Sequence, residues 1–197
     1  MNGIARFFLR AKHWQVFVLL VCTQLAEFVA WIATELTAGP SHGLLISMLI
    51  GEAATVTYCL CLVGWWWSMG SLLHSMVKPT RELNITLFRV SCIVFLLLCG
   101  ILAPLSRLTD DPRLLIAAIG PMLLLFLFSG FYIPYFLSKS LVIKNRGRAA
   151  LGSGEVAFFF LFLFSIVGVW LIQPRINQLY AEKKNAEPYE KQKATFR

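Results

Sequence analysis

The chain has 197 residues, of which 58% are hydrophobic and only 14% are charged, and its mean hydropathy is +0.70. A soluble domain would carry about a quarter charged residues, so the composition excludes an ordinary soluble globular protein. The formal net charge of +8 would suggest a nucleic-acid partner for a soluble protein. In a membrane protein, basic residues instead flank the spans and set their orientation. We therefore expect the lipid bilayer, and not nucleic acid, as the main partner.

Apolar runs along the chain predict an all-α polytopic transmembrane helix bundle, because a bilayer span needs about 20 mostly apolar residues. The five predicted spans are 14–36, 44–68, 85–106, 113–137 and 156–172. They form a single transmembrane domain over residues 1–173, and a polar tail follows over 174–197. Pro112 is predicted in the first turn of the fourth helix, and Pro174 is expected to end the fifth span.

The distribution of lysine and arginine predicts a cytoplasmic amino terminus. With that orientation, only Arg107 and Arg113 lie in outer loops. The inner side receives Arg6, Arg10, Lys12, Lys78, Arg81, Lys139, Lys144, Arg146 and Arg148. Five spans would place the basic tail outside, against this rule. The alternative is four spans plus a re-entrant last segment, whose short apolar stretch is at the low end for a crossing. We expect five spans.

Polar side chains inside the first two spans are the candidates for a functional site. The stretch CTQLAEFVAW places Gln24 and Glu27 in the first span, while Glu52 and Thr55 lie in the second. A short loop joins the two spans, so we expect antiparallel neighbours with both carboxyl groups at similar depth. Small residues recur every fourth position on both helices and would allow close approach. We hypothesise that these four polar residues face a shared pocket.

Two explanations of this carboxylate pair stay open. Intramembrane acids are costly and usually face the interior of a bundle, and two close together can share a proton or a cation. That arrangement would suit a small proton- or cation-coupled transporter or channel. In the other explanation, which we favour, a protonated glutamate forms a hydrogen bond with a neighbouring helix or with a partner subunit.

No other pattern indicates chemistry. The five cysteines lie in apolar runs without the spacing of a zinc site or a disulfide framework, and the three histidines are scattered, so we expect neither a metal nor a cofactor. Three consecutive tryptophans in GWWWSMG, residues 64–70, point in three directions and are typical of a membrane-interface anchor. No phosphate-binding glycine loop, H-E-x-x-H or G-x-S-x-G motif is present, so we expect no enzyme.

Four stretches resemble a group of small, uncharacterised multi-pass bacterial membrane proteins. They are AKHWQVF (11–17), WWWSMG (65–70), PYFLSKSL (134–141) and VGVWLIQPRIN (167–177). The resemblance implies a bacterial-type inner-membrane location and assigns no activity or catalytic residue. Within IQPRIN, we favour a simple end of the span at Pro174; the alternative is that Arg175 and Asn177 meet lipid headgroups or the acidic groups of a partner. We therefore predict a non-enzymatic component or accessory subunit of a membrane complex, bound to a partner protein or a second copy, with the transporter as the alternative.

Overall fold

The computed structural model describes residues 3–36, 42–77, 83–105, 112–146 and 153–195, and these are helical apart from short connectors, with no strand among them. The helices are α1 (Gly3–Arg10), α2 (His13–Leu36), α3 (His42–Met76), α4 (Ile85–Leu105), α5 (Pro112–Arg146), α6 (Ser153–Leu163) and α7 (Ser165–Thr195). The all-α prediction is confirmed. Pro112 begins α5 as expected, and the Asn84 side chain caps α4 by accepting the backbone N–H of Thr86 at 2.9 Å.

Three of these helices contain stretches long and apolar enough to cross a bilayer, namely His13–Ala30, Leu49–Met76 and Ile119–Lys144. In α4 the apolar stretch Ile85–Ile101 is shorter. The helices that contain the second and fourth predicted spans are longer than predicted. Helices α3 and α5 have 35 residues each and measure about 52 Å. Each of these two helices therefore exceeds a hydrocarbon core of about 30 Å.

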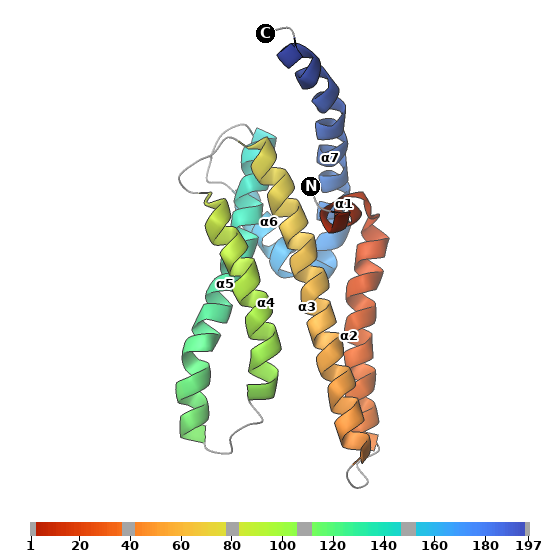
Figure 1. Ribbon diagram of the computed structural model, residues 1–197, viewed down its shortest axis with the longest axis vertical. Helices are drawn as coiled ribbons and strands as arrows, with labels where there is room; N and C mark the ends of the chain where they lie inside the picture. The colour runs from red at the N-terminus through yellow and green to blue at the C-terminus, as the bar shows by residue number, and fades with distance from the viewer. Residues whose placement is uncertain (1–2, 37–41, 78–82, 106–111, 147–152, 196–197) are drawn as a thin grey trace.

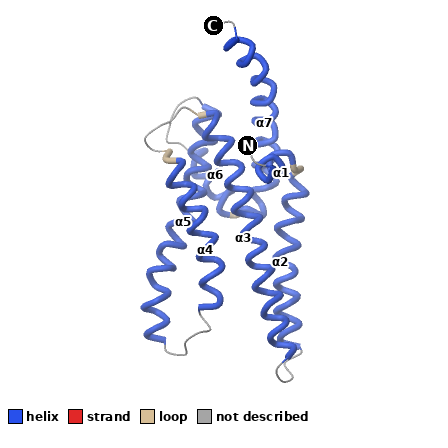
Figure 2. The backbone as a smooth tube through the Cα atoms, viewed as in Figure 1, coloured by secondary structure: helices blue, strands red, loops and turns tan. Residues whose placement is uncertain are grey.

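Two antiparallel hairpins, α2–α3 and α4–α5, make up most of the molecule (Figure 1). Helix α3 is central, since it contacts α1, α2, α4, α5 and α7. The hairpins converge at one end, which we call the near half, where α1, α6 and α7 join them. They diverge toward the other end, the far half, where α2 ends and α3 begins (Figure 2).

The hydrophobic core occupies the near half, because only there do helices from both hairpins and from α6 and α7 meet. Trp65, Phe88, Phe136 and Phe162 are fully buried. Phe88 stacks on Phe136 with ring centroids 4.4 Å apart, which joins α4 to α5. Gly70 of α3 makes room for this pair, since a Cβ there would overlap the Phe88 ring.

In the far half, large apolar side chains on all four helices of the two hairpins are exposed, including Val29, Leu49, Ile101 and Leu124. Helices in lipid keep their backbone bonds internal and can present apolar side chains outward. Within the far half, the described packing contacts of each hairpin are therefore mainly those between its own two helices.

The predicted fifth span, 156–172, is not one helix. Helix α6 ends at Leu163, and α7 begins at Ser165 after a turn at Phe164. From this turn α7 leads back toward the end of the molecule where α3 and α5 also finish (Figure 1). Gly168 permits the close crossing, because a Cβ there would overlap the carbonyl oxygen of Leu161. Hydropathy alone missed the break, since an apolar run does not record the direction of the chain.

The polar segment after the predicted fifth span is also helical. Helix α7 continues through Pro174 to Thr195, so the expectation that this proline ends the helix is wrong. A proline inside a helix removes one backbone donor and can bend the axis. The visible curve of α7 in Figure 1 lies toward its carboxyl end, well beyond Pro174.

The three tryptophans do not form the predicted interface anchor. Trp65 and Trp66 are 0% and 4% exposed, so both lie in the core. Trp66 meets the Phe95 ring edge-on, with centroids 5.6 Å apart. Trp67 is half-buried, and the Arg89 guanidinium lies 5.7 Å from its ring centroid. The near half buries this stretch because α4 and α7 flank it on different sides.

Candidate functional site

The predicted carboxylate pair belongs to the far half of the α2–α3 hairpin. Glu27 lies about 14 Å before the end of α2 at Leu36, and Glu52 about 15 Å after the start of α3 at His42, at about 1.5 Å per residue. Glu52 is half-buried and has an interaction partner. The side chain of Glu27 lies outside the described residues, so the shared pocket stays a prediction.

The two other predicted pocket residues, Gln24 and Thr55, are half-buried on the same hairpin. The Thr55 hydroxyl donates to the Gly51 carbonyl at 3.0 Å, a bond within its own helix. The expected close packing along the small residues of α3 is wrong at Gly51, because a Cβ there would meet nothing within 4 Å. Ala30, one of the predicted small residues of α2, is buried, and so is Ala54 of α3.

A buried polar cluster that the sequence analysis did not identify joins α1, α3 and α7. Gln173 is fully buried, and its Nε2 donates to the carbonyls of Phe8 at 2.8 Å and Ala11 at 3.2 Å and to Asn177 Oδ1 at 3.0 Å. Trp65 Nε1 donates to Gln173 Oε1 at 2.7 Å. Asn177 Nδ2 also donates to the Ala11 carbonyl, at 3.2 Å. We call Gln173, Asn177 and Trp65, with the carbonyl groups of Phe8 and Ala11, the glutamine hub.

The glutamine hub satisfies backbone groups that a helix end leaves without partners. The last carbonyls of a helix have no intrahelical donor, and Gln173 and Asn177 supply donors at the carboxyl end of α1. The hub therefore holds α1 across the bundle. The Asn177 amide, which the alternative reading placed against headgroups or a partner, forms these hydrogen bonds within the molecule.

Lys139 is a second polar residue whose burial the sequence analysis missed. It is 9% exposed on α5, and its Nζ donates to the Tyr135 hydroxyl at 2.9 Å. The flanking Ser138 and Ser140 are buried and bond to carbonyls of their own helix. Lys139 was expected to flank a span at the inner surface. The signal that could have found it is a lysine directly between two apolar segments of PYFLSKSL.

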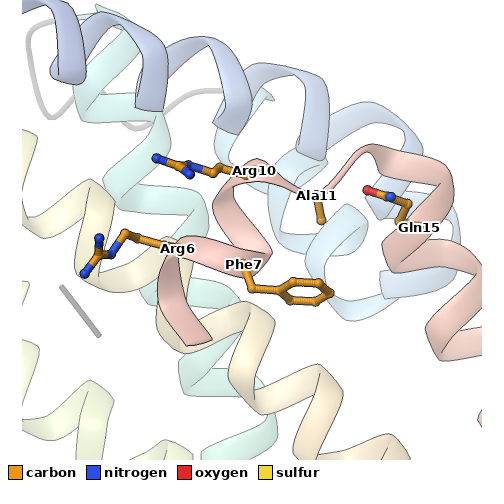
Figure 3. A pocket seen from close by; sticks show the side chains of 5 residues that line it. All are labelled: Arg6, Phe7, Arg10, Ala11 and Gln15. Atoms are coloured by element: carbon orange, nitrogen blue, oxygen red, sulfur yellow. The ribbon is translucent and has the colours of Figure 1, made fainter. Parts of the chain in front are cut away.

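An open groove runs beside α1, with a volume of about 570 Å³. Its lining consists of Arg6, Phe7, Arg10, Ala11 and Gln15. The guanidinium groups of Arg6 and Arg10 project from one side of α1, one helical turn apart (Figure 3). Gln15 Oε1 accepts the backbone N–H of Lys12 at 2.8 Å, which orders the start of α2 beside the groove.

The described part of the chain holds no group of three or more histidine, cysteine, aspartate or glutamate side chains that could bind a metal ion. The five cysteines are free thiols. The sequence matches no protein family model, no curated protein and no solved structure. The arrangement of the residues is therefore the basis for the functional argument.

Proposed function

We propose that the chain is a multi-pass protein of a bacterial-type inner membrane, with a cytoplasmic amino terminus and four spans formed by α2 to α5. Helix α6 has only 11 residues, or about 17 Å, which is too short to cross. The α6–α7 unit then acts as the re-entrant segment and keeps the basic residues of α7 on the same side as Arg6 and Arg10. The basic-side rule for short loops and span ends supports this orientation.

Within this membrane, the protein acts as a non-enzymatic accessory subunit that binds a transmembrane helix of a partner in its far half. The observation that carries this proposal is a set of open glycines. A Cβ at Gly51, Gly100 or Gly120 would meet nothing within 4 Å, whereas one at Gly64 or Gly168 would overlap or crowd neighbouring atoms. Glycine in a helix costs about 1 kcal/mol relative to alanine. In membranes, small residues are used where another helix approaches closely.

A polar position lies in the same half, beside one of these glycines. Glu52, which already has an interaction partner within the chain, directly follows Gly51 on α3, so a helix that approaches Gly51 meets a polar group and not only apolar side chains. The partner is a second membrane protein, and a second copy of this chain is the other outcome of the test.

The test combines photo-crosslinking with glycine substitution. A photo-activatable residue at Leu124, which is 69% exposed, should give a discrete protein adduct in native membranes. Gly100→Leu and Gly120→Leu should reduce that adduct without lowering the melting temperature, because both positions face open space. Ala157→Leu, at an exposed small residue of α6, should leave the adduct unchanged. Lipid adducts alone, unaffected by either glycine change, would contradict the accessory function.

The matched depth of Glu27 and Glu52 favours a second candidate, a small proton- or cation-coupled transporter. A ligand that binds only the native state raises stability by mass action. The melting temperature is therefore measured across pH and across Na⁺, K⁺, Mg²⁺ and Ca²⁺ for the wild type, Glu27→Gln and Glu52→Gln. A shift present in the wild type and lost in both variants would establish an ion or proton site. Flat curves would leave the carboxyl groups structural.

A further inference from the structure

The groove beside α1 belongs to neither proposed function, and its position relative to the membrane defines what can reach it. Helix α2 begins at His13, directly after α1, and its 24 residues measure about 36 Å. That length matches a hydrocarbon core of about 30 Å with a short margin. With α2 as a span, α1 lies at one membrane surface. This step uses the membrane placement proposed above and does not use the accessory function.

Helix α1 has the form of an interfacial helix. It lies across the bundle instead of along it (Figure 1). Phe8 and Leu9 are buried, while Arg6, Phe7 and Arg10 are exposed. Helices with one apolar face and a basic opposite face lie in the plane of the headgroups.

The core and the glutamine hub hold α1 in a defined orientation. The Phe8 ring packs against Gly64 of α3, where a Cβ would come within 2.9 Å of Phe8 Cε2. The carbonyls of Phe8 and Ala11 accept hydrogen bonds from Gln173 of α7. Arg6 and Arg10 are thus presented from a fixed backbone, which lowers the entropic cost of binding a ligand between them.

The chemistry of the groove fits an anion with an apolar tail. Two guanidinium groups one turn apart can donate several charge-assisted hydrogen bonds to a phosphate. No acidic side chain is among the lining residues. Phe7, 59% exposed, also lines the groove, with its ring directed away from the two guanidinium groups (Figure 3), and Trp14, 49% exposed, lies at the start of the adjoining span. Aromatic side chains in such positions sit at the level of the headgroups.

We propose that this groove is a binding site for an anionic phospholipid. The phosphate lies between Arg6 and Arg10, and the upper part of an acyl chain lies against Phe7. A zwitterionic lipid is disfavoured because its ammonium group is repelled by the same guanidinium groups. The volume of about 570 Å³ is within the range of small-molecule pockets.

The binding test uses the purified full-length chain in detergent and native mass spectrometry, with phosphatidylglycerol or phosphatidylcholine added. The wild type should retain phosphatidylglycerol in preference to phosphatidylcholine. Arg6→Gln and Arg10→Gln should each weaken that retention roughly fivefold, the amount expected for a basic residue at an anionic surface. Retention of phosphatidylcholine and the melting temperature should not change, which separates loss of the headgroup site from loss of membrane placement or folding.

A matched control distinguishes this site from general surface charge. The variant Lys184→Gln removes one positive charge at an exposed position of α7, outside the groove, as each single arginine variant removes one charge inside it. It should retain phosphatidylglycerol as the wild type does. An equal loss in this variant, or no preference for phosphatidylglycerol in the wild type, would overturn the proposal.

A last experiment distinguishes a bound lipid from a bound soluble phosphate. Inorganic phosphate at millimolar concentration should not displace phosphatidylglycerol, because it makes no contact with Phe7. Phe7→Ser should weaken retention of phosphatidylglycerol while both arginines remain. Full displacement by inorganic phosphate, together with no effect of Phe7→Ser, would assign the groove to a free anion and contradict the lipid site.

Discussion

At the scale of single residues, two adjacent tryptophans differ in their hydrogen bonding. Trp65 and Trp66 are both buried, but only Trp65 finds an acceptor, the Oε1 atom of Gln173 at 2.7 Å. Trp66 Nε1 has no hydrogen-bond partner among the described residues. Because a buried polar atom left without a partner is costly, the two indoles should respond differently to the same substitution.

We predict that Trp65→Phe lowers stability by about 1–3 kcal/mol beyond the loss of ring volume, because it leaves Gln173 Oε1 buried without a donor. Trp66→Phe removes the same atoms without breaking a hydrogen bond and should cost less. The melting temperature of each variant in one detergent measures the difference. Equal losses would mean that the hydrogen bond to Gln173 contributes nothing to the fold.

At the scale of elements, the α6–α7 unit departs most from the predicted helices. A run of apolar residues from Val156 to Ile172 meets the composition of a short span, yet the chain turns at Phe164. Two features of the structure make this possible. Gly168 accepts the close approach of the Leu161 backbone, and the Phe164 carbonyl accepts the N–H groups of Val167 at 3.0 Å and Gly168 at 2.9 Å.

A substitution at the turn tests this account. Gly168→Ala should lower stability by about 1–3 kcal/mol, the usual cost of overpacking, since the new methyl group meets backbone that cannot rotate away. Gly100→Ala is the matched control, because its Cβ enters open space and alanine favours a helix by about 1 kcal/mol. Thermal unfolding in detergent compares the two. A Gly168→Ala variant as stable as Gly100→Ala would show that the α6–α7 crossing is looser than described.

At the scale of the whole molecule, the described residues place the core that the two hairpins share at one end. The near half buries Phe88, Phe136 and Leu141 together with α6 and α7, whereas large side chains such as Leu49 and Leu124 of the far half are exposed. Between helices in lipid there is no hydrophobic driving force, because acyl chains are as apolar as the side chains. Such a molecule can therefore remain open at one end, where a partner helix can enter.

The path of α7 predicts the position of the carboxyl terminus. A reporter fused after residue 197 should lie on the same side of the membrane as one fused before residue 1, because in the proposed four-span arrangement α6 and α7 enter and leave from that side. A reporter inserted between α2 and α3 should lie on the opposite side and serves as the control. Protease protection or compartment-specific fluorescence measures all three. A carboxyl-terminal reporter on the opposite side would support five spans instead.

Local patterns in the amino-acid sequence determined the helical class, the positions of α2 and α4 and the start of α5 at Pro112. This follows because a helix in lipid satisfies its own backbone, so apolar length and helix caps suffice to predict it. They also placed Glu27 and Glu52 at similar depth on neighbouring helices, although the shared pocket remains a prediction.

The tertiary structure decided the rest. Whether Trp65 anchors in lipid or lies in the core depends on Gln173, 108 positions away along the chain. The turn at Phe164 depends on contact between Gly168 and Leu161, and the groove depends on α1 lying across α3. Each feature is set by contacts between helices, and hydropathy along a chain carries no information about which helices meet.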